Sequence, residues 1–124
     1  MPPVRLRPNI LEGVNALYTA TLVDENGFVI AASALLTLTL TYCDVATRLI
    51  LNGREAQNAL NQHNVTVDNA GLLSWKLQPA DTGIINDGLA VEMHRALFTW
   101  TWGSPIKVGR HEIDLGIENL LKIA

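Results

Sequence analysis

Two histidines and a glutamate are the residues whose types and spacing could bind a metal ion. Glu92 and His94 lie two positions apart, so on a strand their side chains would share one face. His111 lies in a segment expected to form the neighbouring strand. Imidazole and carboxylate groups ligate zinc, so these three residues outline a hypothetical zinc site in a small metalloenzyme. We favour the alternative of an exposed polar row, with His111 hydrogen-bonded at a strand start, and expect no metal and no cofactor.

Other residues with reactive side chains lack the surroundings that chemistry requires. The loop 81–88 could offer Asp81 and Asp87 to calcium, but its order does not fit an EF-hand, and we favour a crossing loop capped by short polar side chains. Asp44 follows Cys43, and an adjacent carboxylate raises the pKa of a thiol, which opposes activation. The chain has no local signature of a catalytic nucleophile and no phosphate-binding loop. We therefore expect a protein that is not an enzyme.

An aromatic group is more informative. Phe98, Trp100 and Trp102 recur at strand spacing on one face of a long strand expected over 89–102. They form either part of the core or an exposed strip that binds another protein or a sugar. The apolar face of this strand changes sides near residues 95–98, which predicts a bulge or an exit from the core there. Phe98, Trp100 and Trp102 are therefore candidate partner-binding residues.

Length, charge and cysteine content limit the class of protein. A chain of 124 residues fits one domain, and a net charge of −3 without clustered Lys or Arg argues against nucleic-acid binding. No apolar run is long enough to span a bilayer, and the first residues do not resemble a signal peptide. The single cysteine excludes an internal disulfide. These features predict a soluble protein that is made in the cytoplasm and has no membrane partner.

Alternating apolar residues predict an all-β domain over residues 15–124. The clearest strand is 35–42, where leucines alternate with threonines, and further strands are expected near 72–77 and 111–118. Arg54–Asn61 is the one stretch that predicts a short helix. Seven or so short strands separated by turns are typical of an antiparallel β-sandwich.

The segment 1–14 differs from the rest of the chain. Its prolines favour extended backbone, and it carries four apolar residues without a clean period: Leu6, Ile10, Leu11 and Val14. One interpretation is a frayed terminus. The other is an extended N-terminal arm that buries these four side chains on a neighbouring subunit, which makes them candidate partner-binding residues.

Three short stretches resemble the immunoglobulin-like domains of tailed-phage virion proteins. They are Thr19–Gly27, Val67–Trp75 and Val108–Leu115, which carry two Asp-x-x-Gly turns, an aromatic strand and a glycine that leads into the last strand. The resemblance implies an immunoglobulin-like sandwich that serves as a capsid decoration or cement protein, or as a neck, tail or baseplate component. It also implies other virion proteins as partners, a homo-oligomer, and a place in the virion after synthesis in the host cytoplasm. A carbohydrate- or receptor-binding module is the competing hypothesis.

Overall fold

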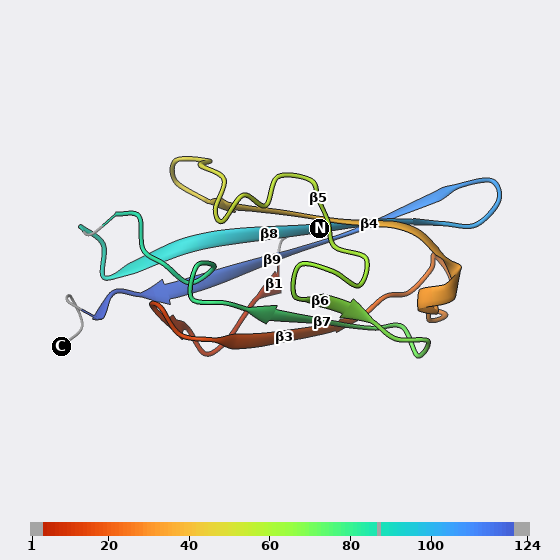
Figure 1. The fold of residues 1–124 in the computed structure, drawn as a ribbon, viewed down its shortest axis with the longest axis horizontal. Helices are drawn as coiled ribbons and strands as arrows, with labels where there is room; N and C mark the ends of the chain where they lie inside the picture. Colours follow the sequence, from red (N-terminus) through yellow and green to blue (C-terminus); the bar gives the residue numbers. More distant parts are fainter. Residues whose placement is uncertain (1–3, 87, 121–124) are drawn as a thin grey trace.

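Two β-sheets packed face to face form the structure, a computed structural model that describes residues 4–86 and 88–120 (Figure 1). One sheet has six strands in the order β1-β9-β8-β4-β5, with β2 also paired to β9, and the other has three in the order β3-β7-β6. This confirms the predicted all-β sandwich. The strands are β1 (Val4–Arg5), β2 (Ile10–Leu11), β3 (Ala16–Thr21), β4 (Leu35–Asp44), β5 (Gln57–Asn58), β6 (Val65–Val67), β7 (Leu72–Leu77), β8 (Val91–Trp102) and β9 (Lys107–Glu118).

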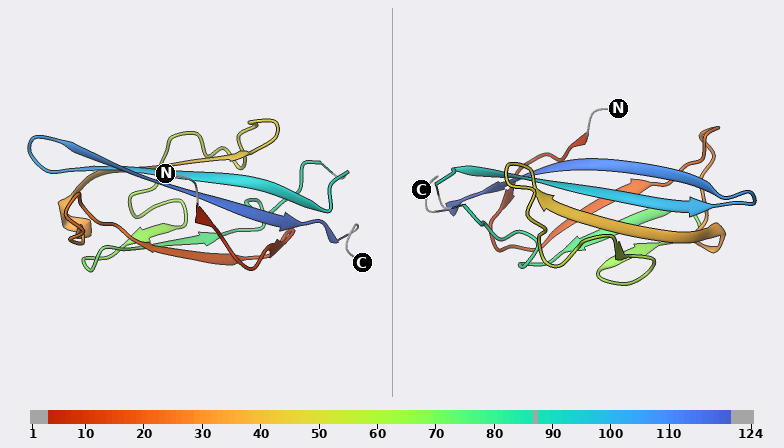
Figure 2. Two further views of the ribbon diagram at one scale, coloured as in Figure 1. Left: turned by 180° about the vertical axis from the view of Figure 1, so that it is seen from behind. Right: turned by 90° about the horizontal axis from the view of Figure 1, so that it is seen from above.

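The longest pairing joins β8 and β9, which run antiparallel in unbroken register from Val91 opposite Glu118 to Trp102 opposite Lys107. The turn of this hairpin projects beyond the body of the sandwich (Figure 2). The bulge predicted near residues 95–98 is therefore wrong. The inward face of β8 does not change sides, because Glu92 and His94 are buried on the same face as Ala96, Phe98 and Trp100.

Large aromatic side chains fill the space between the sheets. Trp75 of β7 is fully buried, and both Tyr42 of β4 and Phe98 of β8 meet it edge-on at ring-centroid distances of 5.2 and 5.7 Å. Such edge-to-face pairs add to the stabilisation that burial alone provides. The alternation predicted for β4 is confirmed from Leu38 to Tyr42, since Leu38, Leu40 and Tyr42 are all fully buried. It is wrong at Leu36, which is 53% exposed, because a register shift between Leu35 and Thr37 turns Leu35 inward in its place.

The helix predicted over Arg54–Asn61 is wrong. Gln57 and Asn58 form β5 on the edge of β4, and Ala56 and Asn61 have positive φ angles that no α-helix contains. The reason is tertiary: the Arg54 side chain is buried against Asp81, and the Ala59 N–H donates to the Leu38 carbonyl. These contacts outweigh a local preference that two helical turns could not sustain alone.

Residues Ala32–Ala34 form a short 3₁₀ turn, η1. The described part of the chain contains no helix long and apolar enough to cross a membrane.

The N-terminal segment lies on the chain's own sheet. β1 and β2 pair in parallel with β9, with Val4 opposite Ile113 and Ile10 opposite Ile117. Ile10 is 8% exposed and belongs to the core, and Leu6 packs against that core. The segment therefore forms the edge of the larger sheet, and its backbone hydrogen bonds are made within the chain.

This placement predicts that neighbouring arm residues contribute very differently to stability. We expect Ile10→Ala to lower the free energy of unfolding by about 2–5 kcal/mol, because it leaves a cavity in the core. Leu11→Ala, at a side chain that is 42% exposed, should change it by less than about 0.5 kcal/mol. Urea denaturation of the two variants measures the difference, and equal values would mean that the arm is not packed as described.

Candidate functional site

The structure brings together only two of the three residues of the hypothetical zinc site. Glu92 and His94 lie side by side in the interior, with 2.6 Å between Oε1 and Nε2. The third residue near them is Asp44, and potential ligand atoms of Asp44, Glu92 and His94 lie within 4.8 Å of one another. His111 lies apart from this group and hydrogen-bonds to Tyr18 of the opposite sheet. The sequence could not indicate Asp44, which the register of β4 on β8 places opposite His94.

These buried polar groups hold the loop that precedes β8. The Glu92 carboxylate accepts hydrogen bonds from the backbone N–H groups of Ile85 and Asn86. The Tyr42 hydroxyl donates to the Asp81 carbonyl at 2.8 Å and lies 2.9 Å from Nδ1 of His94. Since the hydroxyl proton is used on Asp81, Nδ1 must be the donor in the second bond. Burial raises the pKa of Tyr42, so the phenol stays protonated and keeps both bonds.

Asp81 is the centre of a second buried cluster. Its carboxylate accepts from the Arg54 guanidinium at 2.7 and 3.1 Å, from the Asn52 amide at 2.8 Å and from the Gln78 N–H at 2.8 Å. Burial alone would raise the pKa of Asp81, but these hydrogen bonds outweigh it and hold the pKa below its ordinary value of 3.8. Protein donors thus engage the carboxylate considered for calcium, and Asp87 lies outside the described residues.

Cys43 lies half-buried near the end of β4. Burial raises the pKa of its thiol, although Arg48 and Arg95 act in the opposite direction. The thiol is therefore protonated at neutral pH, as expected for a packed side chain.

The aromatic strip divides between core and surface. Phe98 and Trp100 belong to the core, at 1% and 6% exposed, whereas Trp102 is half-buried. Gly109 lies opposite Trp100 on β9, and a Cβ there would come within 2.4 Å of the indole. The indole therefore lies against the β9 backbone, which leaves Trp100 no open ring face of the kind that stacks on sugars.

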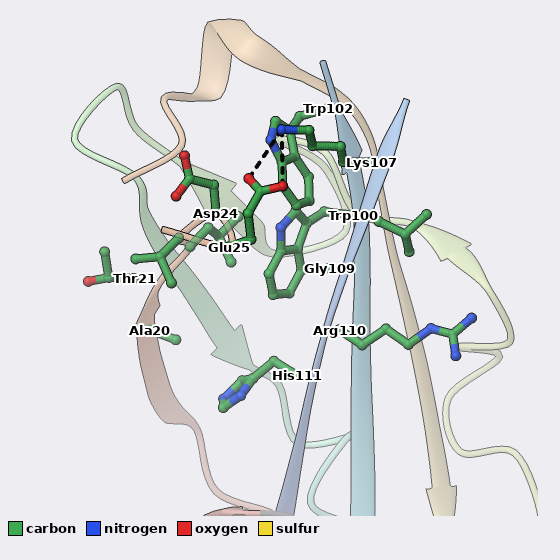
Figure 3. Close-up of a pocket in the computed structure, with 13 residues that line it drawn as sticks. Ala20, Thr21, Asp24, Glu25, Trp100, Trp102, Lys107, Gly109, Arg110 and His111 are labelled. Carbon is green, nitrogen blue, oxygen red and sulfur yellow. Dashed lines mark hydrogen bonds and ion pairs between the residues drawn. The ribbon is translucent and has the colours of Figure 1, made fainter. Parts of the chain in front are cut away.

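Trp100 and Trp102 line a hollow of about 390 Å³ between β3 and β9, which we call the aromatic hollow (Figure 3). Its walls are the end of β3 with the following turn (20–25) and the start of β9 (107–111). Two contacts join these walls. The Tyr18 hydroxyl hydrogen-bonds to Nε2 of His111, and Lys107 forms an ion pair of 3.0 Å with Glu25.

Burial determines the protonation states of Tyr18 and His111 in their hydrogen bond. Burial lowers the pKa of His111 below its ordinary 6.5 and raises that of Tyr18. At neutral pH the contact is therefore a bond from a phenol to a neutral imidazole, with Tyr18 donating. The sequence indicated the tryptophans but not the walls, because only the fold brings 20–25 to 107–111.

The exposed arm residues line a second concave surface. Leu11, Val14 and Leu17 contribute to a hollow of about 290 Å³ between the arm and β3, which we call the arm hollow. Their exposed fractions are 42%, 39% and 59%. Of the four predicted arm contacts, the structure therefore leaves Leu11 and Val14 exposed and packs Leu6 and Ile10 inward.

Comparison of the chain with protein-family models, curated proteins and solved structures gave no match.

The Asp81 cluster predicts acid-sensitive stability. Because the pKa of Asp81 is lowered in the folded state, its contribution is complete above pH 3.8 and is lost as the pH falls through the folded-state pKa. Asp81→Asn should therefore flatten the acid limb of the stability curve. At pH 7 it should cost about 3–5 kcal/mol, because Arg54 keeps a buried, unpaired charge. Urea denaturation from pH 2 to 7 measures both effects, and exposed Glu55→Gln is the control.

Proposed function

We propose that the protein is a non-enzymatic structural protein of a tailed-phage virion. In this proposal it is a capsid decoration or cement protein whose sandwich has the immunoglobulin-like topology. It assembles as a homo-oligomer and with other virion proteins, through surfaces that include the N-terminal segment. The observation that carries the proposal is the arm hollow, where three large apolar side chains are exposed together.

The arm hollow has the character of a docking surface. Leu11 lies in β2, Leu17 in β3 and Val14 in the connection between them, at one edge of the sandwich. Single exposed apolar residues are common, whereas a contiguous apolar surface often marks an interface with another protein. Since β1 and β2 are bound to β9, we infer that assembly uses this folded surface. A free arm that reaches a neighbour is not required.

The buried polar groups are consistent with a structural role. Glu92, His94 and Tyr42 bond to one another and to the loop 81–86, and Asp81 is bonded to Arg54. Each of these groups is at most 2% exposed. In this arrangement they hold the backbone of the loop 81–86 in place and do not face a substrate.

The proposal predicts that charge in the arm hollow prevents assembly and leaves the fold intact. We expect the double variant Val14→Asp, Leu17→Asp to unfold at the wild-type temperature within a few degrees. Its incorporation into particles should fall at least about tenfold, because a buried unpaired carboxylate costs several kcal/mol. Leu49→Asp, at a residue 57% exposed on another loop, is the matched control and should incorporate normally.

Quantitative mass spectrometry of purified particles gives the readout. A wild-type copy number near that of the main shell protein supports decoration or cement, and a few per cent of it supports the neck, tail or baseplate alternative. Absence of the wild-type protein from particles would reject the virion role and favour the receptor-binding hypothesis. Normal incorporation of the double variant would reject the arm hollow as the interface.

A further inference from the structure

We propose that the aromatic hollow and the adjoining free edge of β9 bind an extended strand of a partner protein, and that this strand carries an acidic side chain. The inference rests on the proposed assembly role and deepens it by naming the kind of partner segment. It concerns a different surface from the arm hollow.

The first observation is an open strand edge. Along β9, Asp114 and Glu118 accept hydrogen bonds from the arm through their carbonyls, so even-numbered residues direct their backbone away from β8. Val108 and Arg110 follow the same alternation. The arm strands pair with 113–114 and 117–118, and no described residue pairs with β9 at Val108 or Arg110 from that side.

The opposite wall of the hollow is also an edge. The Leu22 N–H donates to Gly71 beyond the end of β7, so the even-numbered residues of this strand face β7. Thr19 and Thr21 therefore direct their backbone groups outward. An extended segment in the hollow would thus lie between two rows of backbone donors and acceptors, which is the requirement for strand addition.

The second observation is the indole of Trp100. The residue is 6% exposed, and its Nε1 has no hydrogen-bond partner in the described part of the chain. The ring lines the hollow, with its nitrogen on the side that faces β3 (Figure 3). A buried donor without a partner is unfavourable, so a shift of the hollow's wall that lets an acceptor reach this enclosed nitrogen gains a bond that is otherwise unmade.

Charge selects the chemistry of the partner. Glu25 already places a carboxylate on Lys107, in a pair whose side chains are 53% and 47% exposed, and such exposed pairs are weak. Asp24 is occupied by the N–H groups of Asn26 and Phe28 in its own turn. Arg110 is exposed and has no ion-pair partner among the described residues. The Arg110 guanidinium points away from the hollow, on the outer face of β9 (Figure 3). An outward-facing carboxylate on a strand added to this edge can therefore pair with Arg110.

These features favour a peptide over a sugar. The unsatisfied groups are strand backbone and the edge of an indole, whereas sugar platforms present an exposed ring face. The probe is a capped nine-residue peptide of alternating Thr and Val with Glu at its centre, and its matched control has Lys there. Binding to the full ¹⁵N-labelled chain is followed by NMR at the amides of Val108 and Arg110 and at the indole N–H of Trp100.

We expect the Glu peptide to shift these three signals and to bind at least about tenfold more tightly than the Lys peptide. Arg110→Glu should abolish the preference, and Glu25→Gln should leave it unchanged because Glu25 lies at the hollow, away from the Arg110 guanidinium. Lys76→Glu, a charge reversal at an exposed residue of β7, should change nothing. The intact spectrum of each variant establishes that it is folded.

Three results would overturn the inference. They are no shift with either peptide at millimolar concentration, equal affinity for both peptides, and shifts of the Trp100 indole with maltoheptaose or chitohexaose but not with the peptides. The particle assay separates this failure from that of the proposed function. If the peptides fail while charge in the arm hollow still blocks incorporation, only the strand site is rejected. If the peptides bind and the double variant Val14→Asp, Leu17→Asp is incorporated normally, the arm hollow is rejected and the strand site stands.

Discussion

The twelve-residue antiparallel ladder between β8 and β9 determines which side chains enter the interior. Because its register is unbroken, the even-numbered residues of β8 face inward along the strand, from Glu92 at one end to Trp100 at the other. One end of the sandwich is therefore polar inside and the other aromatic. The same register sets Gly109 opposite Trp100, and the missing side chain there gives the indole its space.

Burial of charge at the polar end constrains the rest of the fold. The Glu92 and Asp81 carboxylates can lie in the interior only because the N–H groups of loop 81–86 donate to Glu92 and Arg54 donates to Asp81. Arg54 is drawn inward by Asp81, and the segment after it follows β4 as a short edge strand. The clusters at Glu92 and Asp81 are thus coupled through Tyr42 and the loop, and each depends on the other being formed.

The sequence predicted what local alternation controls and missed what tertiary contact controls. The strands expected over 35–42, 72–77 and 111–118 follow from period-two patterns, and so does the sandwich. The false helix at 54–61 had suitable composition, but composition does not reveal that Arg54 pairs with Asp81. The false bulge in β8 came from the assumption that Glu92 and His94 are exposed. The walls of the aromatic hollow could not be foreseen, because residues 20–25 and 107–111 are remote in sequence.

An open strand edge also carries a risk of pairing with identical edges, and the residues of β9 bear on that risk. Two copies joined antiparallel through the free stretch with Arg110 at the centre would oppose two unpaired guanidinium groups, and like charges directly opposite destabilise a strand pair. Charged side chains on an edge discourage such self-association. The same charge that disfavours a second β9 edge favours an acidic strand, so one residue contributes both repulsion and attraction to specificity. Self-assembly, as proposed, would then use the apolar arm hollow, and partner recognition would use the aromatic hollow.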